Sequence, residues 1–283
     1  MGYTVTQVLT PTSFAGLSIV KPAKVVPTIT MLVYGRSGVG KTTLAGSADA
    51  VPEMRKVLYI DVEAGTLSLR KTRYDVDVVQ ITDYRQLSEL YASLYAGNHD
   101  YQTVVIDSLS EVQELCMREI MREMKEDPEN HERDSDVPGM YEWNKNEKRI
   151  KRLIRLFRDL PINVIFTCLV KEDKDGKTGV VMKLPDLPGK LAHRVAALFD
   201  IVLYYTVLDT DEGQKRVVAS VAGANTVAKN RGSDRLPPIL EIPASAERAS
   251  MAIIYPMIVG EVDSIVPEPD SVPVPVLAAA AAS

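Results

Sequence analysis

Residues 29–43 read Ile-Thr-Met-Leu-Val-Tyr-Gly-Arg-Ser-Gly-Val-Gly-Lys-Thr-Thr. The first six residues are mostly apolar or β-branched, which is typical of a buried strand. The following Gly-x4-Gly-Lys-Thr, from Gly35 to Thr42, has the spacing of a phosphate-binding P-loop between a strand and a helix. A helix-forming segment follows at about 41–48. The stretch therefore predicts a site for a nucleoside triphosphate.

The residue types of this loop explain how it would bind phosphate. Glycines let the backbone turn tightly around an anion, and the backbone amides then point at the phosphates. The Lys41 ammonium is expected to reach the β- and γ-phosphates, and the Thr42 hydroxyl to bind Mg²⁺. The residues predicted to bind ATP are Gly35, Ser37, Gly38, Val39, Gly40, Lys41, Thr42 and Thr43.

Carboxylates end two further predicted strands. Asp107 closes the strand 103–107, and a carboxylate at this Walker-B position holds Mg²⁺ together with Thr42. The alternative is that Asp107 caps the next helix. Asp61 and Glu63 end the strand 56–61 on one face, where one of them could orient or deprotonate an attacking water. A polar loop start explains this pair equally well.

Apolar, β-branched strands alternate with helices along the chain. This pattern predicts a parallel sheet covered by helices on both faces. The predicted strands are 29–34, 56–61, 76–81, 103–107 and 162–168, and the predicted helices are 41–48, 83–97, 109–125, 140–159, 188–198 and 246–257. Residues 200–208 and 216–221 are predicted to form an antiparallel hairpin. We expect a three-layer α/β fold with a mainly parallel central sheet and a C-terminal antiparallel hairpin.

Composition divides the chain into three parts. Residues 1–28 are rich in Thr, Ser and Pro and are predicted to be an N-terminal arm. Residues 29–258 form the predicted core. Residues 259–283, rich in Pro, acidic residues and Ala, are predicted to be a disordered tail. Within the core, the polar residues 126–138 are expected to be a mobile loop.

The overall charge limits the choice of partners. The net charge of −5 rules out a global basic field, so any contact with nucleic acid must come from a local patch. No apolar run reaches the roughly 18 residues of a membrane helix, and no secretory signal pattern begins the chain. We therefore expect a cytoplasmic protein without a membrane partner.

The predicted helix 140–159 has two different faces. Ile150, Leu153, Ile154 and Phe157 follow the spacing of a core face. Its other residues include Lys145, Lys148, Arg149, Lys151, Arg152, Arg155 and Arg158. A solvated helix face explains these cations better than a stripe for nucleic acid does, although both interpretations remain open.

The P-loop, the strand ending Asp61-Val-Glu63 and the strand ending Asp107-Ser108 together resemble a RecA-like P-loop ATPase core. The chain also resembles phage-encoded AAA-domain proteins, some of which act in recombination or single-strand annealing. The resemblance implies that Glu63 activates water. The segment Lys229-Asn230-Arg231 resembles one whose two cations, here Lys229 and Arg231, complete the site of a neighbouring subunit.

The resemblance also implies ATP and Mg²⁺ as cofactors, a ring or filament of identical subunits, and single-stranded DNA as a partner. A single-stranded-DNA-binding protein is a candidate partner, and the location would be the host cytoplasm if a phage encodes the chain. Thr167 stands where RecA has a glutamine that couples nucleotide to DNA. The expected DNA contacts are Lys171, Lys174, Lys177 and Lys183. The alternatives are a nucleotide-gated assembly protein and a small-molecule kinase.

Overall fold

The computed structural model describes residues 12–14, 17–19, 27–128, 134, 136–174, 179–211, 213–242 and 250–260. The chain divides into one unit of residues 1–26 and 261–283 and a second unit of residues 27–260. In the first unit, strands β1 (Thr12–Phe14) and β2 (Leu17–Ile19) pair antiparallel. The rest of the predicted arm up to residue 26, and the predicted tail from residue 261 onward, lie outside the described residues.

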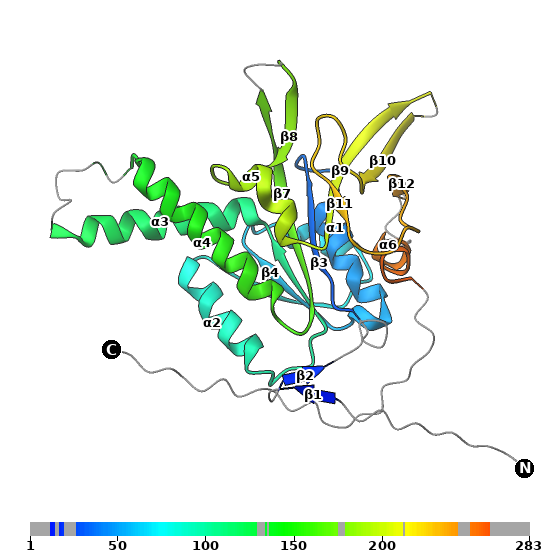
Figure 1. The fold of residues 1–283 in the computed structure, drawn as a ribbon, viewed down its shortest axis with the longest axis horizontal. Helices are drawn as coiled ribbons and strands as arrows, with labels where there is room; N and C mark the ends of the chain where they lie inside the picture. Colours follow the sequence, from blue (N-terminus) through cyan, green and yellow to red (C-terminus); the bar gives the residue numbers. More distant parts are fainter. Residues whose placement is uncertain are drawn as a thin grey trace, which may run out of the picture. The chain divides into compact units, whose positions relative to one another are not determined.

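The second unit is built on one sheet with the strand order β12-β10-β9-β3-β7-β6-β4-β5 (Figure 1). Its parallel strands are β3 (Thr30–Gly35), β4 (Val57–Asp61), β5 (Val76–Gln80), β6 (Thr103–Asp107), β7 (Asn163–Lys174) and β9 (Ile201–Thr210). The strands that pair antiparallel to these are β8 (Val181–Pro185), β10 (Gly213–Ala219) and β11 (Lys229–Asn230), and β12 (Ile239–Ile242) pairs antiparallel to β10. The predicted α/β fold with a mainly parallel sheet and an antiparallel hairpin is confirmed.

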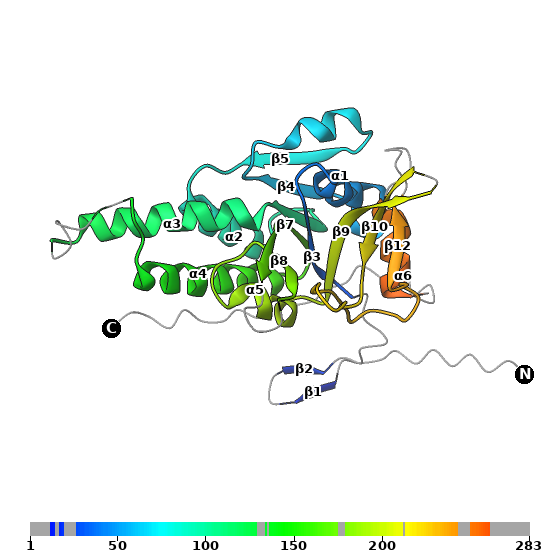
Figure 2. The same cartoon turned by 90° about the horizontal axis from the view of Figure 1, so that it is seen from above.

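Helices cover both faces of this sheet (Figures 1 and 2). One face packs against α2 (Tyr84–Tyr95), α3 (Leu109–Glu126), α4 (Met140–Arg158) and α5 (Leu191–Arg194). The other face packs against α1 (Lys41–Gly46) and α6 (Ser250–Val259). Short 3-10 turns lie at Ser47–Ala50, Pro52–Met54, Thr66–Lys71 and Val195–Leu198.

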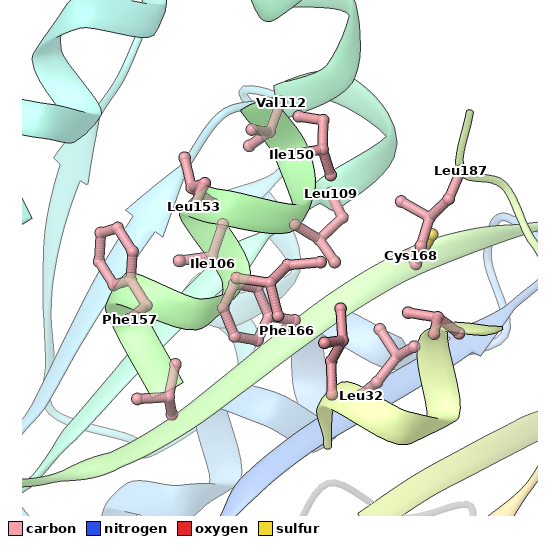
Figure 3. Packing of buried hydrophobic residues seen from close by; sticks show 14 of the residues in the cluster. Leu32, Ile106, Leu109, Val112, Ile150, Leu153, Phe157, Phe166, Cys168 and Leu187 are labelled. Carbon is pink, nitrogen blue, oxygen red and sulfur yellow. The ribbon is translucent and has the colours of Figure 1, made fainter. Parts of the chain in front are cut away.

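Alternation along the P-loop strand explains the two cores. Leu32 and Tyr34 point into the core beneath α3 and α4, whereas Met31 and Val33 point into the core beneath α1 and α6. Figure 3 shows the first of these cores, in which Phe166 of β7 lies among the side chains of the helices. Its ring makes edge contacts with Phe157 and with Phe199, which hold α4 and the segment before β9 onto the sheet.

Three sequence predictions about the elements are corrected by the structure. The strand expected at 162–168 continues to Lys174 and pairs with β8, because its charged end forms a solvated hairpin and not a loop. The helix expected at 188–198 is the short α5 followed by a 3-10 turn. Residues 227–236 were expected to be a polar loop, but residues 229–230 pair with β9 as β11, and β12 at residues 239–242 is a strand that the sequence did not indicate. Much of the predicted mobile loop 126–138 lies outside the described residues.

Candidate nucleotide-binding site

The P-loop connects the end of β3 to the start of α1, and two constraints fix its backbone. Gly38 and Gly40 have φ angles of 77° and 108°, which side chains disfavour. At Gly35 the constraint is space, because a Cβ atom there would collide with the backbone carbonyl oxygen of Tyr205 in β9. The glycines of the motif are therefore needed both for the turn and for the close approach of a neighbouring strand.

Lys41 is buried beneath this loop. Its ammonium donates to the carbonyl oxygens of Gly35 and Arg36, both at 3.0 Å. Burial lowers the pKa of Lys41, and the carboxylates of Asp107 and Glu63 act against this shift. The nearby carboxylates thus favour the charged form of the lysine, which is the form that binds phosphate.

Asp107 lies where three elements meet. Its Oδ2 accepts a hydrogen bond of 2.7 Å from the Thr42 hydroxyl of α1 and another from the Tyr59 hydroxyl of β4. Its Oδ1 accepts from the Thr167 hydroxyl of β7. Because β6 lies between β4 and β7, the sheet order itself places these partners on both sides of the carboxylate. The N-cap of α3 is Ser108, so Asp107 turns toward the P-loop instead of capping the helix.

The two carboxylates after β4 have separate surroundings. Asp61 is buried, and its Oδ1 accepts from the Gly65 amide at 3.1 Å, so it fixes the turn after the strand. Glu63 lines the cavity beside the P-loop, and its Oε1 accepts from the Ser108 hydroxyl. Burial raises the pKa of Glu63, while the bond from Ser108 lowers it. Only Glu63 of the pair is thus placed to act on a bound molecule.

A cavity of about 510 Å³ lies over the P-loop and brings most of the predicted residues together. Those that line it are Ser37, Gly38, Val39, Gly40, Lys41, Thr42, Thr43, Glu63 and Asp107. It is also lined by residues that the sequence did not indicate, among them Lys71, Tyr74, Tyr205, Arg216 and Ser250. These residues come from a 3-10 turn and the loop after it, from the β9–β10 hairpin and from α6. No motif marks them, since only the tertiary fold brings them to the loop.

The structure separates the other predicted residues from this cavity. Lys229 donates to the carbonyl oxygens of Ala196 and Phe199, at 2.8 and 2.6 Å. Arg231 forms an ion pair of 3.1 Å with Asp200. β11 pairs with the first residues of β9, and β9 runs parallel to β3. Both cations therefore lie near the ends of the strands that are opposite to the P-loop. Their predicted role concerns the site of a neighbouring copy and stays a prediction.

The lysines predicted to contact DNA surround the β7–β8 hairpin. The Lys171 ammonium donates to the carbonyl oxygen of Leu187 and lies 4.0 Å from Asp186, so it is already engaged within the chain. Lys174 is exposed at the end of β7, and the Lys183 ammonium lies 5.8 Å from the centre of the Tyr204 ring. Lys177 lies outside the described residues.

The side chains present fit a triphosphate with its Mg²⁺. The loop amides and the Lys41 ammonium suit phosphate oxygens, and hydroxyl and carboxylate oxygens, here of Thr42 and Asp107, are the ligands that Mg²⁺ prefers. Glu63 adds a second carboxylate to the same cavity, and its hydrogen bond comes from Ser108. The fold and the site together define a P-loop nucleotide-binding protein of RecA-like fold.

Comparison with known proteins identifies the family. A family model described as an AAA domain matches residues 28–232, which is more than half of the chain, so the chain belongs to this AAA domain family. No curated protein matches the chain. Among the described residues, no helix is both long and apolar enough to span a membrane.

Two archaeal structures are similar to this chain. One is the flagellar accessory protein FlaH from Methanocaldococcus jannaschii, at 12% identity and a TM-score of 0.42, with 77% of this chain and 85% of that chain covered. The other is the KaiC-like protein PH0186 from Pyrococcus horikoshii OT3, at 14% identity and a TM-score of 0.40, with 76% and 89% covered. Because both TM-scores are low, these likenesses carry no further conclusion. The fold is defined by the strand order of this chain.

The position of Tyr59 generates a prediction about Mg²⁺. Because its hydroxyl fixes the carboxylate of Asp107, Tyr59→Phe is expected to raise the Mg²⁺ concentration needed for half-maximal ATP binding by about tenfold or more. Titrating Mg²⁺ while following a fluorescent ATP analogue measures this concentration. Tyr34→Phe is the matched control, since it removes a tyrosine hydroxyl that bonds to Val227 and Lys183 instead. An unchanged Mg²⁺ requirement in Tyr59→Phe would contradict the role given to this hydroxyl.

Proposed function

We propose that the protein binds ATP with Mg²⁺ and hydrolyses it, and that it acts on single-stranded DNA in recombination or annealing. One observation supports the hydrolysis: Lys41, Thr42, Asp107 and Glu63 all line a single cavity. The DNA part of the proposal is supported by the likeness of the P-loop, the Asp-x-Glu strand end and the Lys-Asn-Arg segment to phage-encoded recombination proteins.

The proposed reaction is the attack of water on the γ-phosphorus. A bond forms between the water oxygen and phosphorus, the bond to the oxygen of ADP breaks, and Glu63 accepts the proton that water loses. Lys41 and the loop amides hold the phosphates in place, while Thr42 and Asp107 would hold the metal. Mg²⁺, when bound, neutralises charge on the phosphate oxygens. The products are ADP and inorganic phosphate.

The surroundings of Glu63 suit a general base. Its Oε1 is occupied by the Ser108 hydroxyl, which leaves Oε2 for a water molecule. A carboxylate whose pKa is raised binds a proton more strongly, and it therefore accepts one from water more readily. The hydrogen bond from Ser108 also fixes the direction of the side chain, which lowers the cost of ordering it during the reaction.

The proposal includes assembly into a ring or filament in which cations of one copy reach the nucleotide of the next. The Arg231 side chain is 63% exposed, and a planar guanidinium bonded to one carboxylate has further N–H groups to offer. Lys229, in contrast, is bound to two backbone carbonyls in this conformation. Arg231 is therefore the stronger candidate for a contact between copies.

Two substitutions separate binding from hydrolysis. Lys41→Ala is expected to abolish ATP binding, because it removes the ammonium that contacts the phosphates. Glu63→Gln is expected to keep ATP binding and to lose turnover by about 10²-fold or more, since the amide cannot accept the proton. Calorimetry measures the binding, and phosphate release, with and without single-stranded DNA, measures the turnover.

The matched control is Glu111→Gln, which alters a carboxylate in the first turn of α3 that does not line the cavity. Turnover at the normal rate in Glu63→Gln would contradict the proposed base. Turnover that single-stranded DNA does not change, together with no binding of DNA, would remove the DNA part and leave the ATPase part intact. Transfer of phosphate to a small molecule instead of water would indicate a kinase.

The pKa of Glu63 predicts a pH dependence. The base acts in its ionised form, so turnover should fall as the pH drops through the pKa, which lies above the ordinary glutamate value of 4.5. The Ser108 hydrogen bond favours the ionised form, and its loss in Ser108→Ala should therefore move the acid limb of kcat to higher pH. Turnover measured in steps from about pH 5 to 9 tests this. An acid limb that stays in place or moves to lower pH in Ser108→Ala would contradict it.

A further inference from the structure

The cations of α4 fall into two groups. Lys145 and Arg149 both form ion pairs with Glu123 of α3, at 2.7 and 2.8 Å, and Arg158 pairs with its neighbour Asp159. The exposed cations that have no ion-pair partner among the described residues are Lys148, Lys151, Arg152 and Arg155. Acidic side chains thus pair with three of the cations of α4, and the other four have no ion-pair partner among the described residues.

The unpaired cations form a stripe along the helix. Their spacing of i, i+3, i+4 and i+7 places them next to one another on one exposed face. Like charges so placed destabilise a helix, and the net charge of the whole chain is −5. Other cations on the same side of the sheet do have partners, as Arg85 and Arg122 do in Glu119. A local excess of positive charge in an acidic protein attracts a polyanion.

Aromatic side chains lie beside this stripe. A groove of about 360 Å³ separates α2 from α4, and its lining includes Tyr84, Tyr91 and Arg152. The ring centres of Tyr91 and Tyr95 lie 5.8 Å apart at an angle of 30°, and Tyr95 is 52% exposed. Tyr91 also packs against Phe157 of α4, so the tyrosines are held along the helix that carries the cations. Arg152 of the stripe therefore shares one groove with Tyr84 and Tyr91, and the exposed Tyr95 lies beside Tyr91.

We propose that this surface binds single-stranded DNA, and the proposal rests on the DNA part of the proposed function. The α2–α4 surface consists of Lys148, Lys151, Arg152, Arg155, Tyr91 and Tyr95. The cations bind the phosphates of one strand, while an unpaired base stacks on the exposed ring of Tyr95, which Tyr91 supports. In a duplex the bases are already stacked on one another, so the aromatic half of the surface favours a single strand.

This surface fits DNA better than the lysines of the β7–β8 hairpin do. Glu172 and Asp173 stand beside Lys171 and Lys174 on β7 and reduce the positive charge there. Lys171 is bound within the chain, and no tyrosine, tryptophan or phenylalanine occurs among the paired residues of that hairpin, 170–174 and 181–185. The α2–α4 surface has both the uncompensated charge and the rings that the hairpin lacks.

Binding of a fluorescein-labelled oligo(dT) by the full chain, followed by anisotropy at several salt concentrations, tests the proposal. A variant with Lys148, Lys151, Arg152 and Arg155 all changed to Gln should bind at least about tenfold more weakly. The slope of log K against log salt should become less negative by about 3, which corresponds to four lost phosphate contacts at about 0.7 each. Tyr95→Ala should weaken binding about tenfold and leave the slope unchanged.

The matched control carries Lys174→Gln and Lys183→Gln, and it should bind as the unaltered protein does. Unchanged ATP binding and thermal unfolding show that each variant is folded.

The outcomes separate the surface from the DNA role. If the unaltered protein binds DNA and the four-Gln variant binds it equally well, or if the control variant shows the loss, the assignment of the α2–α4 surface is wrong while the DNA role stands. If polyglutamate or duplex DNA competes as well as oligo(dT), the stacking contact is wrong. If no DNA binds at all, this proposal and the DNA part of the function fail, and the ATPase proposal remains.

Discussion

The nucleotide site depends on one buried carboxylate. Asp107 is 2% exposed, and a charge so far from water is tolerated only when hydrogen-bond donors surround it. Those donors are the hydroxyls of Thr42, Tyr59 and Thr167, from the helix after the P-loop and from the strands on either side of β6. The carboxylate therefore ties the P-loop to the centre of the sheet, and the order of the strands is part of the site.

The hydrogen bonds of this site occupy the groups that would bind phosphate and metal. Thr42 donates to Asp107, the carboxylate that would hold a metal, and Lys41 donates to carbonyls of its own loop. Both side chains are thus occupied by internal partners that phosphate and Mg²⁺ would replace. Thr167 bonds to Asp107 and lies on the strand that continues into the β7–β8 hairpin. The same strand thus runs from the candidate site to a solvated part of the sheet, and the coupling role predicted for Thr167 stays a prediction.

The sequence predicted the parts of the site that a motif or a strand end marks. The P-loop, Asp107 and Glu63 follow from motifs and from strand ends, and the parallel sheet follows from alternating strands and helices. Tyr59, Tyr74, Tyr205 and Arg216 could not be found in this way, because they reach the site only through the order and twist of the strands. The β7–β8 hairpin was missed for a different reason: its charged residues resemble a loop when the pairing strand is unknown.

The basic face of α4 shows a similar limit. From spacing alone, a solvated helix face was the better explanation of its cations. Only the structure shows that Glu123 neutralises Lys145 and Arg149, while the stripe that begins at Lys148 has no ion-pair partner among the described residues. The groove beside α2 cannot be seen in the sequence either, since its tyrosines lie on another helix, far earlier in the chain than α4.

The role of Asp107 as the metal-binding carboxylate is tested most directly by calorimetry of ATP binding to Asp107→Asn, with and without Mg²⁺. The substitution keeps the shape of the side chain and removes its charge. Mg²⁺ should strengthen ATP binding to the unaltered protein by about tenfold or more, and this gain should be lost in Asp107→Asn while Mg²⁺-free binding persists. A variant that folds normally and still gains as much affinity from Mg²⁺ would show that the metal does not depend on this carboxylate.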